Sequence, residues 1–178
     1  MAAANGYKER MAALDSPDRL KRLRQHLLEG GAEVLVTDSD NLSQTIIGLI
    51  GERGWHKLVS VRRNRVGHPS VLGDDPPLED DEVAQLDAVI TESAVAAADP
   101  GLIVLDHTLG QGRPALVSIP PTHVCVVEEV QVVDDIDSAL ARLDPAHPTT
   151  WIAGPDAPSD LIAGLHRPTS LVVVLVAQ

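Results

Sequence analysis

The chain has 178 residues, enough for one domain of ordinary size, and its 44% hydrophobic and 22% charged residues exclude disorder as its main state. Acidic residues outnumber basic ones by 26 to 14, and the formal charge of −12 opposes binding to nucleic acid or to an anionic membrane. A basic cluster at Arg62, Arg63 and Arg65 is too small for a nucleic-acid footprint. With two Trp, one Tyr and no Phe, the chain also lacks a platform for stacking RNA bases.

Cysteine usage and targeting signals narrow the class further. Cys125 is the only cysteine, which excludes an internal disulfide and a cysteine-ligated zinc or iron–sulfur cluster. The seven histidines form no close metal-binding pair. The longest apolar run, residues 171–177, is far shorter than the roughly 20 residues of a membrane-spanning helix, and the N-terminus lacks the apolar core of a signal peptide. We therefore expect a cytoplasmic protein with no metal or cofactor of its own and no membrane contact.

The first third of the chain predicts a strand–helix–strand unit. The sequence of residues 7–29 predicts a helical lead-in that is interrupted at Ser16-Pro17 and ended by Gly30-Gly31. A β-branched run at 32–37 predicts a strand, and Asp38, Ser39 and Asp40 offer capping oxygens to a helix with an apolar stripe over 42–50. Residues 57–61 predict the next strand, so the two strands should be parallel with a right-handed crossover.

Residues 62–82 break the alternation and end in an acidic, proline-containing stretch that is typical of a flexible surface loop. Beyond it we expect an alanine-rich helix at 93–99 and a capped helix over 136–143, together with strands at 87–90, 101–105, 122–127, 149–153 and 171–176. The fold class is therefore α/β, with an open, mostly parallel sheet covered by helices on both faces. We expect residues 1–31 to form the lead-in and residues 32–178 to form the domain.

Ligands of open parallel sheets bind beyond the carboxyl ends of the strands. The predicted strand ends carry side chains of both charges, which could form a binding crevice. The alternative is that strand ends are polar simply because they are exposed to solvent. The residues at these ends are Asp38, Arg62, Thr91 with Glu92, Asp106 with His107, Glu128, and Gly154-Pro155-Asp156. The Gly110–Pro114 segment fits a plain turn better than a phosphate loop, because it matches neither glycine motif and Pro114 lacks an N–H donor. Cys125 alternates within an apolar strand and is best interpreted as a buried structural thiol.

Three segments, in order along the chain, resemble the LUD-domain family of lactate-utilisation proteins, and most closely its protein C (LutC) branch. The end of the chain, Trp151-Ile-Ala-Gly-Pro-Asp followed by Gly164-Leu-His-Arg-Pro and an apolar strand, is similar to the family's G-P-S and G-V-H-G-P ending. Residues 96–105 resemble its A-I-A-E/D-T-G-T segment and strand, and residues 119–127 resemble its L-P-x-x-H-I-x-V-V.

The resemblance implies a set of ligand-binding residues, namely Asp99, Gly101, His123, Gly154, Asp160 and His166. The equally weighted alternative is that these residues cap and brace the final strands. The chain departs from the family pattern at Pro100, Leu102, Asp156, Ile162 and Arg167, and it is shorter between Asp160 and Gly164. No catalytic residue can be assigned from spacing alone.

The resemblance also implies a fold similar to the ribose-5-phosphate isomerase and CoA-transferase group, and an accessory role in oxidising L-lactate to pyruvate with iron–sulfur partner proteins. The alternative is a stand-alone enzyme or binding protein for a phosphorylated sugar or CoA-type ligand. In that case Glu92, Asp99, Asp106 or His166 would act as acid or base, and the anion would be received by Arg62, Arg63, Arg65 and Arg113. A third hypothesis is a degenerate member kept for protein contacts. Homo-oligomerisation is left open.

Overall fold

The computed structural model describes residues 18–61 and 66–177. Its first element, α2 (Asp18–Glu29), buries Leu20, Leu23 and Leu27 on one face, as their helical spacing predicts. The helix ends before Gly30, and Gly31 takes a positive φ of 80°, which is favourable for glycine. The expected break at Ser16-Pro17, and the lead-in before it, lie outside the described residues.

The large sheet has six strands, and every neighbouring pair is parallel. Its spatial order is β1 (Glu33–Asp38), β10 (Ser170–Ala177), β7 (Thr122–Glu128), β4 (Ala88–Glu92), β2 (Leu58–Ser60) and β3 (Val71–Leu72). Helix α3 (Leu42–Arg53) connects β1 to β2. The expected α/β class with an open parallel sheet is confirmed.

A second sheet was not expected from the sequence. It has four strands in the order β8 (Val132–Val133), β5 (Val95–Ala97), β6 (Leu102–Leu105) and β9 (Thr150–Ile152). The prediction of a helix at 93–99 is wrong, because β5 lies there and pairs antiparallel with β6. All three residues of β5 are fully buried, and this packing overrides the helical preference of alanine. The strands expected at 101–105 and 149–153 belong to this small sheet.

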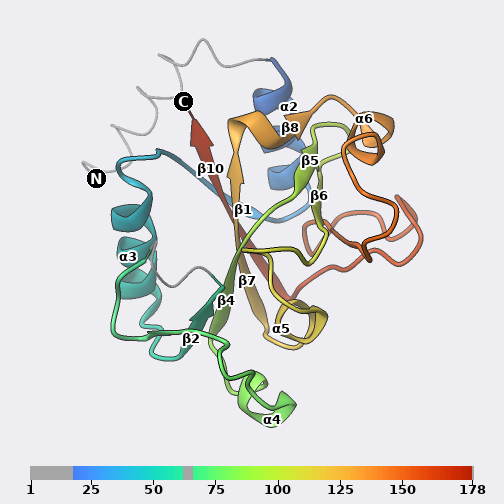
Figure 1. Cartoon of the computed structure of the whole chain (residues 1–178). Coiled ribbons are helices and arrows are strands. Elements are labelled where there is room, and N and C mark those ends of the chain that lie inside the picture. The colour runs from blue at the N-terminus through green and yellow to red at the C-terminus, as the bar shows by residue number, and fades with distance from the viewer. Residues whose placement is uncertain (1–17, 62–65, 178) are drawn as a thin grey trace.

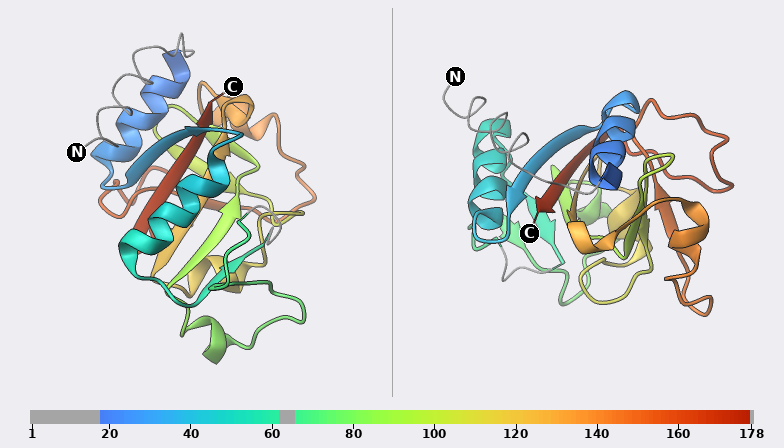
Figure 2. Two further views of the ribbon diagram at one scale, coloured as in Figure 1. Left: turned by 90° about the vertical axis from the view of Figure 1, so that its left-hand side faces the viewer. Right: turned by 90° about the horizontal axis from the view of Figure 1, so that it is seen from above.

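The two faces of the large sheet have different cover (Figures 1 and 2). Apolar residues of α3, including Leu42, Ile46 and Ile50, pack on one face. On the other face α2 packs together with the small sheet, in a cluster that joins Leu23 to Ile103 and other residues of both sheets. The outer face of the small sheet is covered by α6 (Ile136–Leu140) and by residues that precede β10. The small sheet is thus an additional layer beside a helix-covered parallel sheet.

The segment expected to be a loop, 62–82, is partly regular. Residues 62–65 lie outside the described residues, but β3 pairs with β2, and α4 (Asp80–Val83) forms a short helical turn. Arg113 holds the segment: its Nε lies 2.8 Å from Asp74 Oδ2 and its guanidinium also donates to the Leu78 carbonyl. Pro114 begins the short helix α5 (Pro114–Ser118) directly after this arginine. The flexibility of 62–82 stays a prediction.

Helix caps follow the sequence in one case and not in another. Asp134 and Asp135 were both candidates to cap α6, and the cap is Asp135, which accepts a hydrogen bond of 2.8 Å from the Ser138 N–H. The N-cap of α3 is Asn41 rather than Asp38, Ser39 or Asp40, and Asp38 instead accepts from the Asn41 N–H at 2.9 Å. In the part of the chain that the structure describes, no helix is long and apolar enough to cross a membrane.

Candidate functional site

A crevice runs along the carboxyl ends of the large sheet, on the face that α3 covers. Because side chains alternate along a strand, the parallel register places Ser60, Glu92 and Glu128 at the last α3-facing positions of three neighbouring strands. The register of β7 with β10 also brings Val176 beside Glu128. This is the strand-end position at which open α/β sheets bind ligands.

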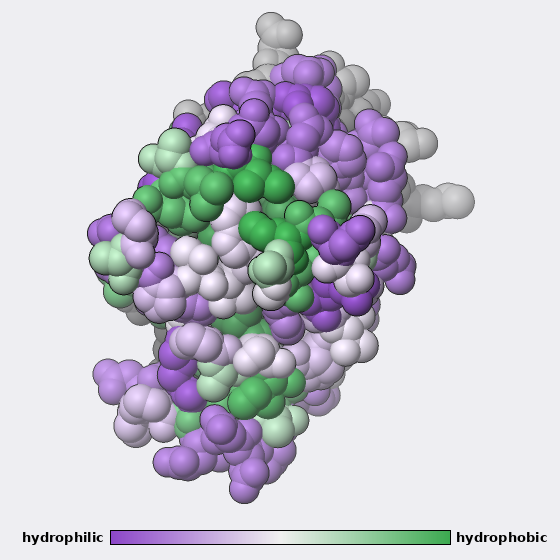
Figure 3. Space-filling view, turned by 90° about the vertical axis from the view of Figure 1, so that its right-hand side faces the viewer, coloured by the Kyte–Doolittle hydropathy of each residue, from purple (hydrophilic) through white to green (hydrophobic). Residues whose placement is uncertain are grey.

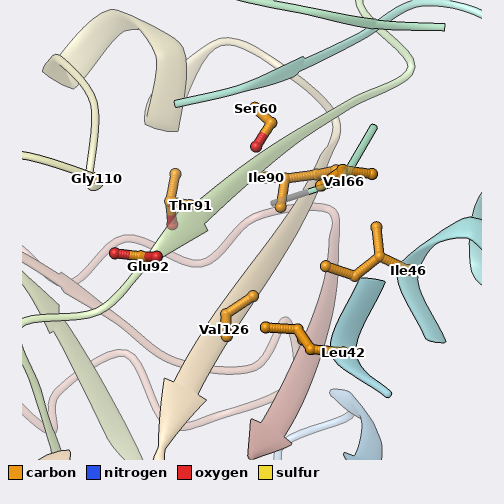
Figure 4. Close-up of a pocket in the computed structure, with 9 residues that line it drawn as sticks. All are labelled: Leu42, Ile46, Ser60, Val66, Ile90, Thr91, Glu92, Gly110 and Val126. Atoms are coloured by element: carbon orange, nitrogen blue, oxygen red, sulfur yellow. The ribbon is translucent and has the colours of Figure 1, made fainter. Parts of the chain in front are cut away.

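Two hollows lie along this edge, and Leu42 of α3 borders both. The outer hollow measures about 260 Å³ and is lined by Ser39, Leu42, Ser43, Glu128 and Val176. The inner hollow has room for about one water molecule. Figure 4 shows its lining: Leu42, Ile46 and Val66 face Ile90 and Val126, while Ser60, Thr91, Glu92 and Gly110 supply the polar end.

The lining of the crevice combines hydroxyl groups with carboxylates. Serine side chains can donate or accept hydrogen bonds, whereas Glu92 and Glu128 are the ionisable side chains among the described residues that line the two hollows. Arg62, Arg63 and Arg65, which the sequence offered for anion binding, lie outside the described residues. Arg113 is engaged with Asp74 instead.

The loop after β6 borders the inner hollow. The Glu92 N–H donates to the Gly110 carbonyl at 2.9 Å, so this loop is fixed to the end of β4. His107, at a positive φ of 57°, has its Nδ1 2.8 Å from the Gly112 carbonyl oxygen and its Nε2 2.8 Å from Thr150 Oγ1. Burial alone would raise the pKa of Asp106, but hydrogen bonds from Thr108 and Gln111 outweigh it and lower the pKa. Asp106 is therefore ionised at neutral pH and is poorly suited to act as a general acid.

The structure distributes the six residues implied by the family resemblance over three places. Asp99 lies at the turn after β5, where Arg22 of α2 forms ion pairs with it and with Asp134. Gly101 follows with a φ of 88°, and a Cβ added there would lie 2.5 Å from the Cβ of His26. The space beside Gly101 is thus filled by α2.

Gly154 shows a similar close approach at a second place. A Cβ on Gly154 would lie 2.2 Å from the Gly30 carbonyl oxygen, in the turn between α2 and β1. The Asp156 N–H donates to the same oxygen at 2.9 Å. Asp160 lies further along the same connection and is exposed. The nearest neighbour of Gly154 is therefore backbone of this chain, which favours the bracing interpretation of this residue.

His123 and His166 make up the third place, between the two sheets. His123 is fully buried on β7, and its Nε2 lies 2.7 Å from Thr91 Oγ1. Burial, and then the charge of a protonated His166, lower the pKa of His123 to about 3. The resemblance includes both histidines, which lie 43 positions apart in the sequence, and a protonated His166 lowers the pKa of His123.

Within the described ranges, no three His, Cys, Asp or Glu side chains are grouped so that they could hold a metal ion. The crevice residues Ser39, Ser43 and Ser60 were not singled out as binding residues from the sequence. Ser60 could have been found from its place at the end of a predicted strand. The two other serines belong to the β1–α3 connection and its helix start, and only the structure brings them to Glu128.

Comparison with known proteins gives a consistent assignment. The sequence profile of the LUD domain matches residues 78–176, more than half of the chain. The protein named Lactate utilization protein C from Deinococcus radiodurans is 41% identical over 114 residues, which are 60% of this chain and 54% of that protein. The chain thus aligns with about half the length of that relative.

The fold comparison covers more of the molecule. The crystal structure of a DUF162 family protein from Deinococcus radiodurans superposes with a TM-score of 0.73 and 30% sequence identity, covering 89% of this chain and 96% of the other. The family match and these two likenesses agree with the three motifs quoted from the sequence. The chain belongs to the LUD-domain family.

Proposed function

We propose that this protein is an accessory subunit in the oxidation of L-lactate to pyruvate and that it works with partner proteins that carry iron–sulfur clusters. The observation that carries the proposal is the 41% identity to a protein named Lactate utilization protein C. The family match over residues 78–176 supports the same assignment. A cytoplasmic location is part of this proposal.

The single cysteine supports an accessory role rather than that of electron carrier. Iron–sulfur clusters are held by several cysteine thiolates, and this chain has only Cys125. Cys125 is fully buried, and burial raises its pKa to about 12, so the thiol stays protonated at neutral pH. The clusters of a lactate-oxidising system would therefore reside in the partners.

The alternative proposal is a stand-alone enzyme or binding protein for a phosphorylated sugar or CoA-type ligand. The hollows at the strand ends favour it, because this is where α/β sheets bind ligands. Ligand binding to the native state raises the melting temperature. A sugar phosphate or CoA that stabilises the purified chain by several degrees would support the alternative, and no shift at millimolar concentration would count against it.

The direct test of the accessory role is affinity capture of the tagged full chain from cells grown on L-lactate. We expect co-purified proteins that contain iron and acid-labile sulfide, and we expect the same proteins with a Cys125→Ala variant, because the thiol holds no cluster. Pyruvate-grown cells provide the control for expression of the partners. Capture without any iron–sulfur protein would contradict the proposal.

A further inference from the structure

The outer face of the small sheet is covered by aliphatic side chains that are themselves only half-buried. They come from two segments, namely α6 with the turn that follows it, and the connection between β9 and β10. All of them pack on the buried cluster that contains Trp151 and Ala157. The side chains are Ile136, Leu143, Leu161, Ile162 and Leu165.

Leu140 extends this layer toward solvent. It lies one helical turn after Ile136 and is 52% exposed. Together with the five side chains above, it makes up what we call the outer patch. Figure 3 views the side of the molecule that carries α6 and the β9–β10 connection, and apolar (green) surface gathers in the middle of this side between hydrophilic (purple) regions. Exposed apolar surface with a polar rim is typical of a contact site for another protein.

The rim of the outer patch is acidic. Asp137, Asp144 and Asp160 are exposed, and each of them adjoins a patch residue in the sequence. Residues 134–167, which contain the whole patch, have six Asp against two Arg, a formal charge of −4. Both arginines donate hydrogen bonds to backbone carbonyl oxygens of this chain. The rim therefore favours a partner that presents Lys or Arg around its apolar contacts.

The same charge argues against a second copy of this chain as the occupant. Two outer patches packed on each other would bring two acidic rims into one interface, each with a formal charge of −4. Like charges that face each other across an interface oppose association. A basic partner removes this repulsion, and the attraction between opposite charges also raises its rate of association.

We propose that the outer patch is the docking surface for a basic, apolar segment of the iron–sulfur partner protein. The aliphatic side chains of the patch are the anchors, and the aspartates of its rim contact Lys or Arg of the partner. The inference rests on the proposed function, because that function supplies the partner. It adds the place at which the partner binds and the chemistry of the segment that binds there.

Affinity capture of the tagged full chain from lactate-grown cells tests this surface, with bound iron and acid-labile sulfide per captured chain as the readout. Leu140→Asp should lower the bound iron at least about tenfold, because a charge replaces an apolar anchor. Leu140 is half exposed, so the variant should fold, and its melting temperature checks this. Leu109→Asp is the matched control, because Leu109 is 84% exposed on the loop after β6, and it should retain the iron.

The charge of the rim is tested separately. Asp137→Lys combined with Asp160→Lys should lower the bound iron about tenfold. The control, Asp75→Lys combined with Asp81→Lys, changes two exposed aspartates outside the rim and should leave the bound iron within about twofold of wild type. Raising NaCl from about 50 mM to about 0.5 M should weaken capture by the wild type severalfold, because salt screens exposed charges. Salt would instead favour a dimer of two acidic patches.

Amide hydrogen exchange of the captured complex locates the contact. Exchange should slow within residues 136–143 and 158–166 and stay unchanged within α3. Equal bound iron in the wild type and both patch variants, or protection of α3 instead of the patch, would overturn the docking surface and leave the proposed function standing. A wild-type chain that captures no iron–sulfur protein would contradict the proposed function and this inference with it. A homodimer that Leu140→Asp dissociates would assign the patch to a second copy and would also overturn the inference.

Discussion

Replacing Gly154 by alanine tests whether this motif glycine is a structural contact of the fold. The added methyl group would lie 2.2 Å from the carbonyl oxygen and 2.6 Å from the carbonyl carbon of Gly30, and 3.2 Å from the Ala32 nitrogen. All three atoms are backbone, so no side chain can rotate to make room. Overpacking of this kind costs about 3 kcal/mol, and loss of the Asp156–Gly30 hydrogen bond adds about 1 kcal/mol.

The assay is thermal or chemical unfolding of the purified variant. For a domain of this size the combined loss corresponds to a melting temperature lower by about 8–16 °C. Gly48→Ala is the matched control, because Gly48 lies in α3 with nothing within 4 Å of an added Cβ, and alanine there should stabilise the helix by about 0.5–1 kcal/mol. An unchanged stability of Gly154→Ala would refute the contact and would leave Gly154 available for a ligand.

Two further predictions concern His123 and Arg113. In the unfolded chain His123 binds a proton below about pH 6.5, whereas in the folded protein it does so only near its pKa of about 3. The contribution of neutral His123 to the free energy of unfolding is therefore complete above about pH 6.5 and is lost as the pH falls toward about 3. In denaturant unfolding, we expect this residue to lower the free energy of unfolding by about 2 kcal/mol between pH 7 and pH 5. His123→Asn should remove this pH dependence and His147→Asn should not. An equal dependence of the unfolding free energy on pH in wild type and His123→Asn would contradict the prediction. Arg113→Met should increase protease cleavage within residues 74–83, because it removes the bonds to Asp74 and Leu78. Cleavage at the wild-type rate would show that the bonds do not hold the segment.

The sequence predicts those elements whose pattern is dictated locally. The continuous β-branched run that forms β10 is typical of a buried strand, and the apolar stripe of α3 has the spacing of a helix. Both patterns therefore also predict that these elements are buried in or against the large sheet. Strand β5 was mistaken for a helix because its alanines favour helix, while its true determinant is burial between two sheets. The Asp99-Pro100-Gly101 turn, which joins β5 to β6, was the available sign of a hairpin.

The candidate site shows the same division between local and long-range information. Strand-end positions such as Glu92 and Glu128 follow from strand boundaries, and the rule for parallel sheets places them in one crevice. The close approaches at Gly101 and Gly154 depend on where α2 and its turn dock, which no motif encodes.

Growth of a strain that lacks this protein tests the central claim most directly, with L-lactate as the sole carbon source and pyruvate as the control. We expect loss of growth on lactate alone, restored by the wild-type chain and also by Cys125→Ala, because the proposal places the clusters in the partners. Normal growth of the deletion strain on lactate would contradict a role in lactate oxidation. Failure of Cys125→Ala to restore growth, although the variant accumulates as a folded protein, would contradict the accessory role.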